Sequence, residues 1–147
     1  YHYKAPEGLY DPMSAVLCFP NNFQDDYDDD GWFRVTNIAN YSAWKELERK
    51  DYLNQKQDVA INAYQILSKF APKLENDFLF KDIFTPTTIT KYTSHFKGTV
   101  YGSTDKSKDG TTKYDGLYIC GTDQGFLGIV GSILSGISMA NLHGLMK

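Results

Sequence analysis

The sequence predicts a mixed α+β fold with a small β-sheet, one long amphipathic helix and a C-terminal unit of strand, glycine-rich turn and helix. Short segments rich in apolar and β-branched residues predict strands at 15–19 and 32–38. Apolar residues recur at helical spacing from 51 to 71. Glycines gather at 121–128, just before an uncharged helical segment. Strands and helices are therefore mixed along the chain, which is typical of a small α+β fold.

Length and composition predict one core. The chain has 147 residues, a usual size for a single domain, and we expect an irregular arm at 1–14 followed by one domain at 15–147. A net charge of −3 with only two arginines argues against nucleic acid as a partner. Gly, Ser and Asn dilute the longest uncharged run, 126–142, below the roughly 18 apolar residues of a membrane span. We expect neither a transmembrane helix nor a signal peptide.

In the N-terminal half, the two strands are predicted to form a hairpin with a long loop. The helix that follows has Asp51 to cap its first turn and Pro72 to end it, because the residue before proline avoids helical geometry. A separate short helix is expected at 44–48.

The second half is predicted to contain more extended structure. Segments 78–84 and 87–92 are rich in aromatic and β-branched residues and are interpreted as extended. A short apolar strand is expected at 116–120 and a helix at 129–142, with the glycine-rich turn between them.

That turn is the best candidate for ligand binding. A strand, a turn and a helix place free backbone N–H groups and the positive end of a helix dipole at one spot, where an anion can bind. Gly121, Gly125 and Gly128 let a ligand approach the backbone. Asp123 can accept hydrogen bonds from ribityl or sugar hydroxyls, or from a nearby backbone N–H. The alternative is a turn that only leads into a tightly packed helix.

The C-terminal helix carries a stripe of small residues at four-residue steps. The stripe consists of Gly128, Ser132, Gly136 and Ala140. Another backbone or a flat ligand can approach such a face closely. The alternative is tight packing against an element of the same protein.

An acidic loop offers a weaker candidate. Five aspartates lie within 25–30, and Asp26, Asp28, Asp30 and Gly31 reproduce the start of a calcium loop. The twelfth position is Asn37 instead of Glu, and no helix precedes the loop. We therefore expect a solvated acidic loop rather than a cation site.

Histidines and cysteines give no catalytic or metal assignment. His2, His95 and His143 have no ligand-like spacing. Cys18 and Cys120 each lie in an apolar run and are expected to be buried thiols. We therefore assign no catalytic residue and no metal.

Several ordered stretches match one known family. They are Tyr41-Ser-Ala-Trp44, Tyr52 to Lys56, Phe84-Thr-Pro-Thr-Thr88, Lys97-Gly-Thr-Val-Tyr-Gly102, Gly116-Leu-Tyr-Ile-Cys-Gly121-Thr-Asp123, Gly128-Ile-Val-Gly131 and Ser135-Gly136. Together they resemble the C-terminal part of FAD-dependent oxidoreductases of the phytoene desaturase, carotenoid isomerase and retinol saturase group. In that family the last block closes over the flavin. The resemblance therefore implies flavin contacts from Gly121, Asp123, Gly128 and Gly131, with Gly125 in the same turn, and a substrate-covering role for the preceding elements.

The sequence also departs from that family. The G-x-G-x-x-G turn that binds the ADP half of FAD is missing near the start of the chain. The resemblance thus implies a truncated flavoenzyme-like fold, with no cofactor on the lone chain and FAD only where a dinucleotide-binding half is present.

Three functions are consistent with these observations. The first is a non-catalytic structural or interaction subunit, derived from a carotenoid-modifying flavoenzyme and docked in a larger, membrane-peripheral assembly of the plastid such as a photosynthetic pigment–protein complex. The second is the C-terminal fragment of an active FAD-dependent desaturase, isomerase or saturase. The third is a module that binds a carotenoid or another pigment.

Overall fold

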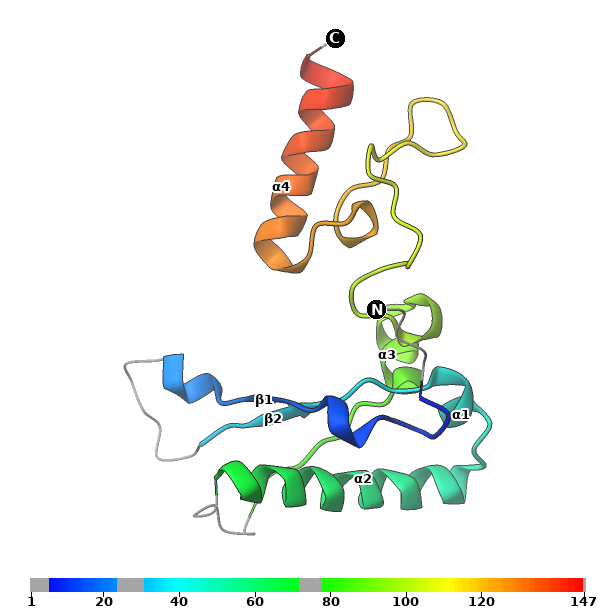
Figure 1. Ribbon diagram of the computed structural model, residues 1–147. Coiled ribbons are helices and arrows are strands. Elements are labelled where there is room, and N and C mark those ends of the chain that lie inside the picture. Colours follow the sequence, from blue (N-terminus) through cyan, green and yellow to red (C-terminus); the bar gives the residue numbers. More distant parts are fainter. Residues whose placement is uncertain (1–5, 24–30, 72–77, 147) are drawn as a thin grey trace. The chain divides into compact units, whose positions relative to one another are not determined.

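The computed structural model describes residues 6–23, 31–71 and 78–146. They belong to two compact units, unit 1 (residues 1–88) and unit 2 (residues 89–147). Helices predominate, together with a two-stranded antiparallel sheet (Figure 1), which confirms the mixed α+β class. The predicted acidic loop at 25–30 lies outside the described residues.

The sheet of unit 1 is the predicted hairpin. Strand β1 (Val16–Cys18) pairs antiparallel with β2 (Arg34–Thr36), and Leu17 lies opposite Val35. Both strands are shorter than predicted, because pairing covers only three residues of each. Cys18 is half-buried.

The described part of the N-terminal arm is tied to the segment that follows β2. The amide of Asp11 donates to the carbonyl of Ile38 at 2.9 Å, and the amide of Asn40 donates to the carbonyl of Leu9 at 2.9 Å. The indole Nε1 of Trp44 donates to the same Leu9 carbonyl at 2.9 Å. These bonds satisfy backbone groups of a segment that has little regular structure.

Helix α1 (Tyr41–Lys45) begins three residues before the predicted short helix. Its start is fixed by Asn40, whose side-chain oxygen accepts the amides of Ser42 and Ala43. Asparagine is a favoured cap because it satisfies amides that have no partner within the helix.

Helix α2 (Arg49–Phe70) confirms the predicted long helix and ends just before Pro72. The expectation that Asp51 caps it is wrong. Glu48 occupies the cap position without a side-chain hydrogen bond, and Asp51 lies inside the first turn. There its negative charge interacts favourably with the positive N-terminal end of the helix dipole.

Helix α3 (Pro86–Thr93) corrects the expectation of an extended segment at 87–92. Pro86 fits the first helical position, where its missing N–H costs nothing. The hydroxyl of Thr85 accepts the amide of Thr88 at 3.2 Å and so acts as a cap. This local start signal outweighs the β-branched composition. Residues 78–84 form no strand.

The core of unit 1 is small. Trp44 and Leu67 are 3% and 0% exposed, and Thr85 is 2% exposed. The rings of Trp44 and Tyr52 meet edge to face at 5.5 Å between centroids. This contact joins α1 to α2.

Unit 2 contains helix α4 (Gly128–Ala140) followed by one π-helical turn (Asn141–Leu145), which confirms the predicted C-terminal helix. The strand expected at 116–120 is wrong, because the described residues there make a single bridge, between Thr111 and Tyr118. The chain turns at Gly116, where φ is +73°, and pairing with 110–111 is limited to this bridge and the bond from the Ile119 amide to the Gly110 carbonyl.

Two further features of unit 2 differ from the sequence-based expectation. Cys120 is exposed rather than buried, because its segment is not part of a sheet. Residues 128–145 form a helix that is long and apolar enough to cross a membrane, although only 11% of this stretch is buried. Core helices of soluble proteins pass the same length and composition test, but they are mostly buried.

Candidate functional site

The glycine-rich turn folds back on itself in front of α4. Residues Thr122–Gln124 form a short 3-10 helix, closed by bonds from the Gln124 amide to the Gly121 carbonyl and from the Gly125 amide to the Thr122 carbonyl, both at 3.1 Å. Gly121 and Gly125 have φ values of +93° and +118°. Residues with a side chain rarely adopt these values, so the turn needs glycine at both positions.

Asp123 is engaged by the loop that precedes the turn. Its carboxylate oxygen Oδ1 accepts the amide of Ser103 at 2.6 Å, and its backbone carbonyl accepts the amide of Ser107 at 3.0 Å. A Cβ on Gly102 would lie 2.4 Å from the same carboxylate oxygen. In this structure, therefore, the Asp123 carboxylate accepts a backbone N–H, one of the two roles that its sequence position allowed.

Lys106 joins the same loop to the turn. Its ammonium group donates to the carbonyls of Tyr101 and Thr122, at 2.5 and 2.9 Å. Hydrogen bonds from a charged donor are stronger than neutral ones. Two side chains therefore join the loop to the turn: Asp123 of the turn accepts from the loop, and Lys106 of the loop donates to the turn.

A buried polar pair, missed by the sequence analysis, connects the turn to α4. Ser135 and Gln124 are 0% and 5% exposed. The Ser135 hydroxyl accepts the amide of Gly121 at 2.6 Å and donates to the side-chain carbonyl of Gln124. The Gln124 amide group donates in turn to the carbonyl of Lys108 at 2.8 Å. The sequence carries no local signal for this pair, since Gln124 and Ser135 lie eleven residues apart.

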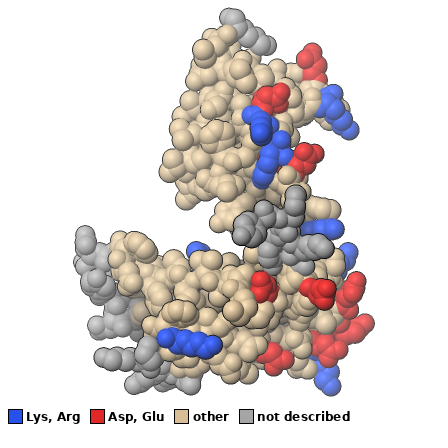
Figure 2. All heavy atoms as spheres, viewed as in Figure 1, with Lys and Arg blue, Asp and Glu red and all other residues tan. Residues whose placement is uncertain are grey.

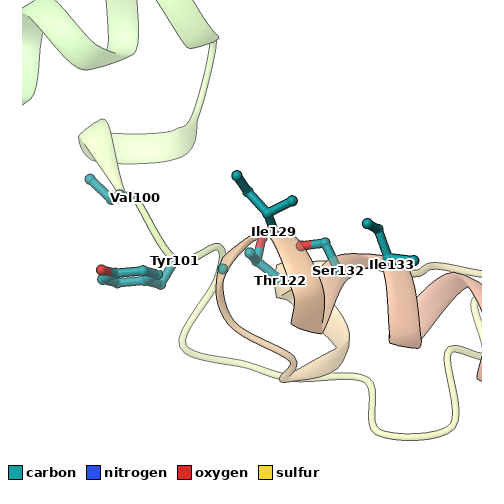
Figure 3. Close-up of a pocket in the computed structure, with 7 residues that line it drawn as sticks. Val100, Tyr101, Thr122, Ile129, Ser132 and Ile133 are labelled. Atoms are coloured by element: carbon teal, nitrogen blue, oxygen red, sulfur yellow. The ribbon is translucent and has the colours of Figure 1, made fainter. Parts of the chain in front are cut away.

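A groove of about 500 Å³ lies beside the turn (Figure 3). Its lining comprises Val100, Tyr101, Thr122, Gly128, Ile129, Ser132 and Ile133. The α4 residues form one wall, and Val100 and Tyr101 lie across the opening (Figure 3). The surface is mainly aliphatic and aromatic, with a few hydroxyls, so it suits an apolar or flat partner.

The glycines predicted to contact a flavin lie in two kinds of surroundings. An added Cβ at Gly121, Gly125 or Gly128 would meet no atom within 4 Å, so the space in front of these glycines is open. At Gly131 the same Cβ would lie 3.1 Å from the backbone of Phe126. Gly131 therefore faces the chain itself and permits close packing of the segment before α4.

The small-residue stripe is only partly covered within the described chain. Gly136 has no atom within 4 Å of an added Cβ, and Ala140 is exposed. Beside the stripe, Ile129, Ile133 and Ile137 are 84%, 60% and 53% exposed. We call this face, formed by Ile129, Val130, Ile133, Gly136, Ile137 and Ala140, the α4 surface.

The α4 surface contains no acidic or basic side chain. No Asp, Glu, Lys or Arg occurs from 124 to 146. In Figure 2 the side of unit 2 where α4 lies is uncharged, whereas lysines and acids gather over the loop on its other side. A large exposed apolar face of this kind marks a protein–protein or membrane interaction site.

Unit 1 holds a second polar cluster, around Tyr52. The Tyr52 hydroxyl lies 2.8 Å from that of Thr85, 3.1 Å from that of Thr88 and 3.5 Å from that of Thr87. Burial acts to raise the pKa of Tyr52, but the hydrogen bonds with the three threonines and the charge of Lys56 together lower it below 10.0. These hydrogen bonds connect the two helices, so we assign the cluster a role in joining α2 to α3.

This lowered pKa predicts a pH-dependent contribution to stability. Because the folded-state pKa of Tyr52 lies below the unfolded-state value, ionisation of Tyr52 stabilises the fold above the unfolded pKa, and this gain disappears as the pH falls through the folded pKa. We expect the difference in unfolding free energy between the native chain and Tyr52→Phe to grow from about pH 7 to about pH 10.5, measured by urea unfolding. A difference that stays constant or shrinks over this range would contradict the assignment.

The described parts of both units contain no cluster of metal-ligating side chains. No set of three or more His, Cys, Asp or Glu side chains there is arranged to hold a metal ion. His143 instead donates from its Nε2 to the Asp109 carbonyl at 2.7 Å, and its ring stacks on Tyr118. His95 likewise bonds within its own loop, through Nδ1 to the Thr99 carbonyl at 2.8 Å.

Comparison with known proteins gives one relative. The chain is 30% identical, over 149 aligned residues, to the chloroplastic prolycopene isomerase of Arabidopsis thaliana. The similarity supports a relation to carotenoid-modifying enzymes. The alignment covers 92% of this chain but 25% of the relative, so the chain spans about a quarter of that protein's length. No family model and no solved structure matches.

The relative also bears on location. It is a chloroplastic protein, which is consistent with the plastid expected from the sequence.

Proposed function

We propose that this chain is a non-catalytic interaction element, related to carotenoid-modifying enzymes, that docks on a second protein body through unit 2. The observation that carries the proposal is the α4 surface, where Ile129 and Val130 are 84% and 71% exposed on a helix without charged residues. Covering a large aliphatic side chain stabilises a complex by about 1.5–3 kcal/mol per residue. A partner that covers this face is thereby favoured.

The chemistry of the groove supports a non-catalytic role. Its side chains are aliphatic, aromatic or hydroxyl groups. Such groups orient an apolar or flat partner but supply no general base that works near neutral pH. The Asp123 carboxylate beside it already accepts the Ser103 amide. The groove therefore serves as a contact surface next to the α4 surface.

The proposed host is an assembly of the plastid, peripheral to a membrane, such as a photosynthetic pigment–protein complex. The chloroplastic location of the prolycopene isomerase relative supports the compartment. The uncharged α4 surface supports a partner with an apolar contact face.

A second candidate is the C-terminal part of an FAD-dependent carotenoid desaturase, isomerase or saturase. The similarity to a prolycopene isomerase over most of this chain favours it. The turn fits a flavin in part, because the space in front of Gly121, Gly125 and Gly128 is open. Gly131 packs on Phe126, and Asp123 is held by Ser103, so these two positions fit less well. FAD would supply the redox chemistry, and the chain would form one wall of its site.

A leucine in the small-residue stripe tests the docking proposal. We expect Gly136→Leu to weaken docking about tenfold or more, since overpacking a close contact costs about 1–3 kcal/mol. The isolated chain should become slightly more stable, because Gly136 faces open space and leucine favours a helix over glycine. The assembly reconstituted with each chain would be titrated by a competition assay, with unfolding of the free chain measured in parallel.

Gly144→Leu is the matched control, since Gly144 also has no atom within 4 Å of an added Cβ but lies beyond the end of α4. Docking of Gly136→Leu with native affinity would overturn the proposal. A loss of docking together with an equal loss of folding stability would also count against it.

A further inference from the structure

The polar pair Gln124 and Ser135 lies behind the groove and touches both of its sides. Ser135 is on α4, one turn after Ser132, which lines the groove. Gly121 directly precedes Thr122, which lines the groove on the side of the turn. The bond from the Gly121 amide to the Ser135 hydroxyl, at 2.6 Å, therefore joins the turn to the helix just behind the groove.

Gln124 extends this connection to the loop. Its side chain accepts the Ser135 hydroxyl and donates to the Lys108 carbonyl at 2.8 Å. One buried chain of hydrogen bonds thus links loop, turn and helix. Each member has a partner, and a fully satisfied buried network fixes one geometry.

We infer that Gln124 and Ser135 are positioning residues of the groove, which set the distance between its turn wall and its helix wall. This inference rests on the proposed role of the groove as a contact surface. Other contacts also hold the turn: an added Cβ at Gly131 on α4 would lie 3.1 Å from the Phe126 backbone, and Asp123 and Lys106 bind the turn to the loop. The Gln124–Ser135 pair adds a buried side-chain link that joins turn, helix and loop in one network.

Backbone hydrogen exchange of the 147-residue chain tests this inference. Ser135→Ala removes the acceptor of the Gly121 amide, and we expect exchange at Gly121 to become at least about tenfold faster. The amide of Ile119, which donates to the Gly110 carbonyl at 2.7 Å, should keep its native exchange rate because it does not touch the pair. Ser138→Ala is the control, since Ser138 is on the same helix but donates only to the Leu134 carbonyl.

Ser135→Cys addresses the case in which the alanine variant fails to fold. Cysteine nearly keeps the volume of serine but forms weaker hydrogen bonds, so Gly121 should exchange at an intermediate rate in a folded chain. Faster exchange confined to Gly121 and its turn would support the inference. Unchanged exchange at Gly121, or equally faster exchange at Gly121 and Ile119, would overturn it.

These measurements need no partner, so they separate this inference from the proposed function. Native docking by Gly136→Leu would overturn the docking proposal, whereas exchange at Gly121 alone decides whether the pair positions the turn.

Discussion

Replacing Gly110 with alanine is expected to lower the unfolding free energy of unit 2 by about 2–5 kcal/mol. Gly110 has a φ of +70°, and an added Cβ would lie 2.6 Å from the Ile119 carbonyl and 2.2 Å from the sulfur of Met139. The Met139 side chain can move, but the Ile119 carbonyl belongs to the backbone and cannot move without shifting the chain. The alanine methyl therefore forces the loop away from α4.

Gly116→Ala is the matched control for this prediction. Gly116 has a similar φ of +73°, but nothing lies within 4 Å of an added Cβ. Its substitution should cost only the backbone strain, about 1–2 kcal/mol. Thermal unfolding of the two variants gives the comparison. Equal losses would show that the crowding at Met139 and Ile119 has no effect.

Leu67→Ala is expected to destabilise unit 1 by about 2–5 kcal/mol. Leu67 is the side chain that α2 buries completely in the core of unit 1, so its truncation leaves a cavity there. Urea unfolding followed by tryptophan fluorescence measures the loss.

Leu53→Ala, on the same helix, serves as the control because Leu53 is 45% exposed. It should cost clearly less than Leu67→Ala. Similar losses at the two positions would mean that Leu67 does not anchor the core of unit 1.

The elements that could be predicted are those with a strong local signal. Helix α2 has a long amphipathic repeat and a proline after its end, and the hairpin has two apolar segments of high β-propensity. Helix α4 was visible as a long segment without charge. In each case the pattern and the tertiary structure favour the same element.

The secondary-structure predictions were wrong where a local cap or turn motif opposed the residue composition of the segment. The segment after Thr85 is rich in β-branched residues, yet a threonine cap followed by proline starts a helix there. Residues 116–120 are apolar enough for a strand, but the chain turns at Gly116 and pairs with 110–111 through a single bridge. Cys120 is exposed for the same reason.

The sequence predicted where the candidate site lies but not the tertiary contacts that form it. The glycines of the turn and the small residues of α4 indicated where a ligand or a partner comes close. The pairing of Gln124 with Ser135 joins residues eleven apart through a bond that exists only in the folded chain. The engagement of Asp123 by Ser103, twenty residues away, is likewise a property of the tertiary structure.

The most direct test of the central claim is a titration of the isolated 147-residue chain with FAD, followed by flavin fluorescence and by the flavin that stays bound after gel filtration. The claim is that the chain is a non-catalytic interaction element, which docks on a second protein body and holds no cofactor by itself. We expect no saturable binding of FAD to the chain alone. Retention of about one FAD per chain would contradict this claim, because a chain that retains FAD forms a cofactor site of its own, in which about 70–90% of the ligand's surface is buried.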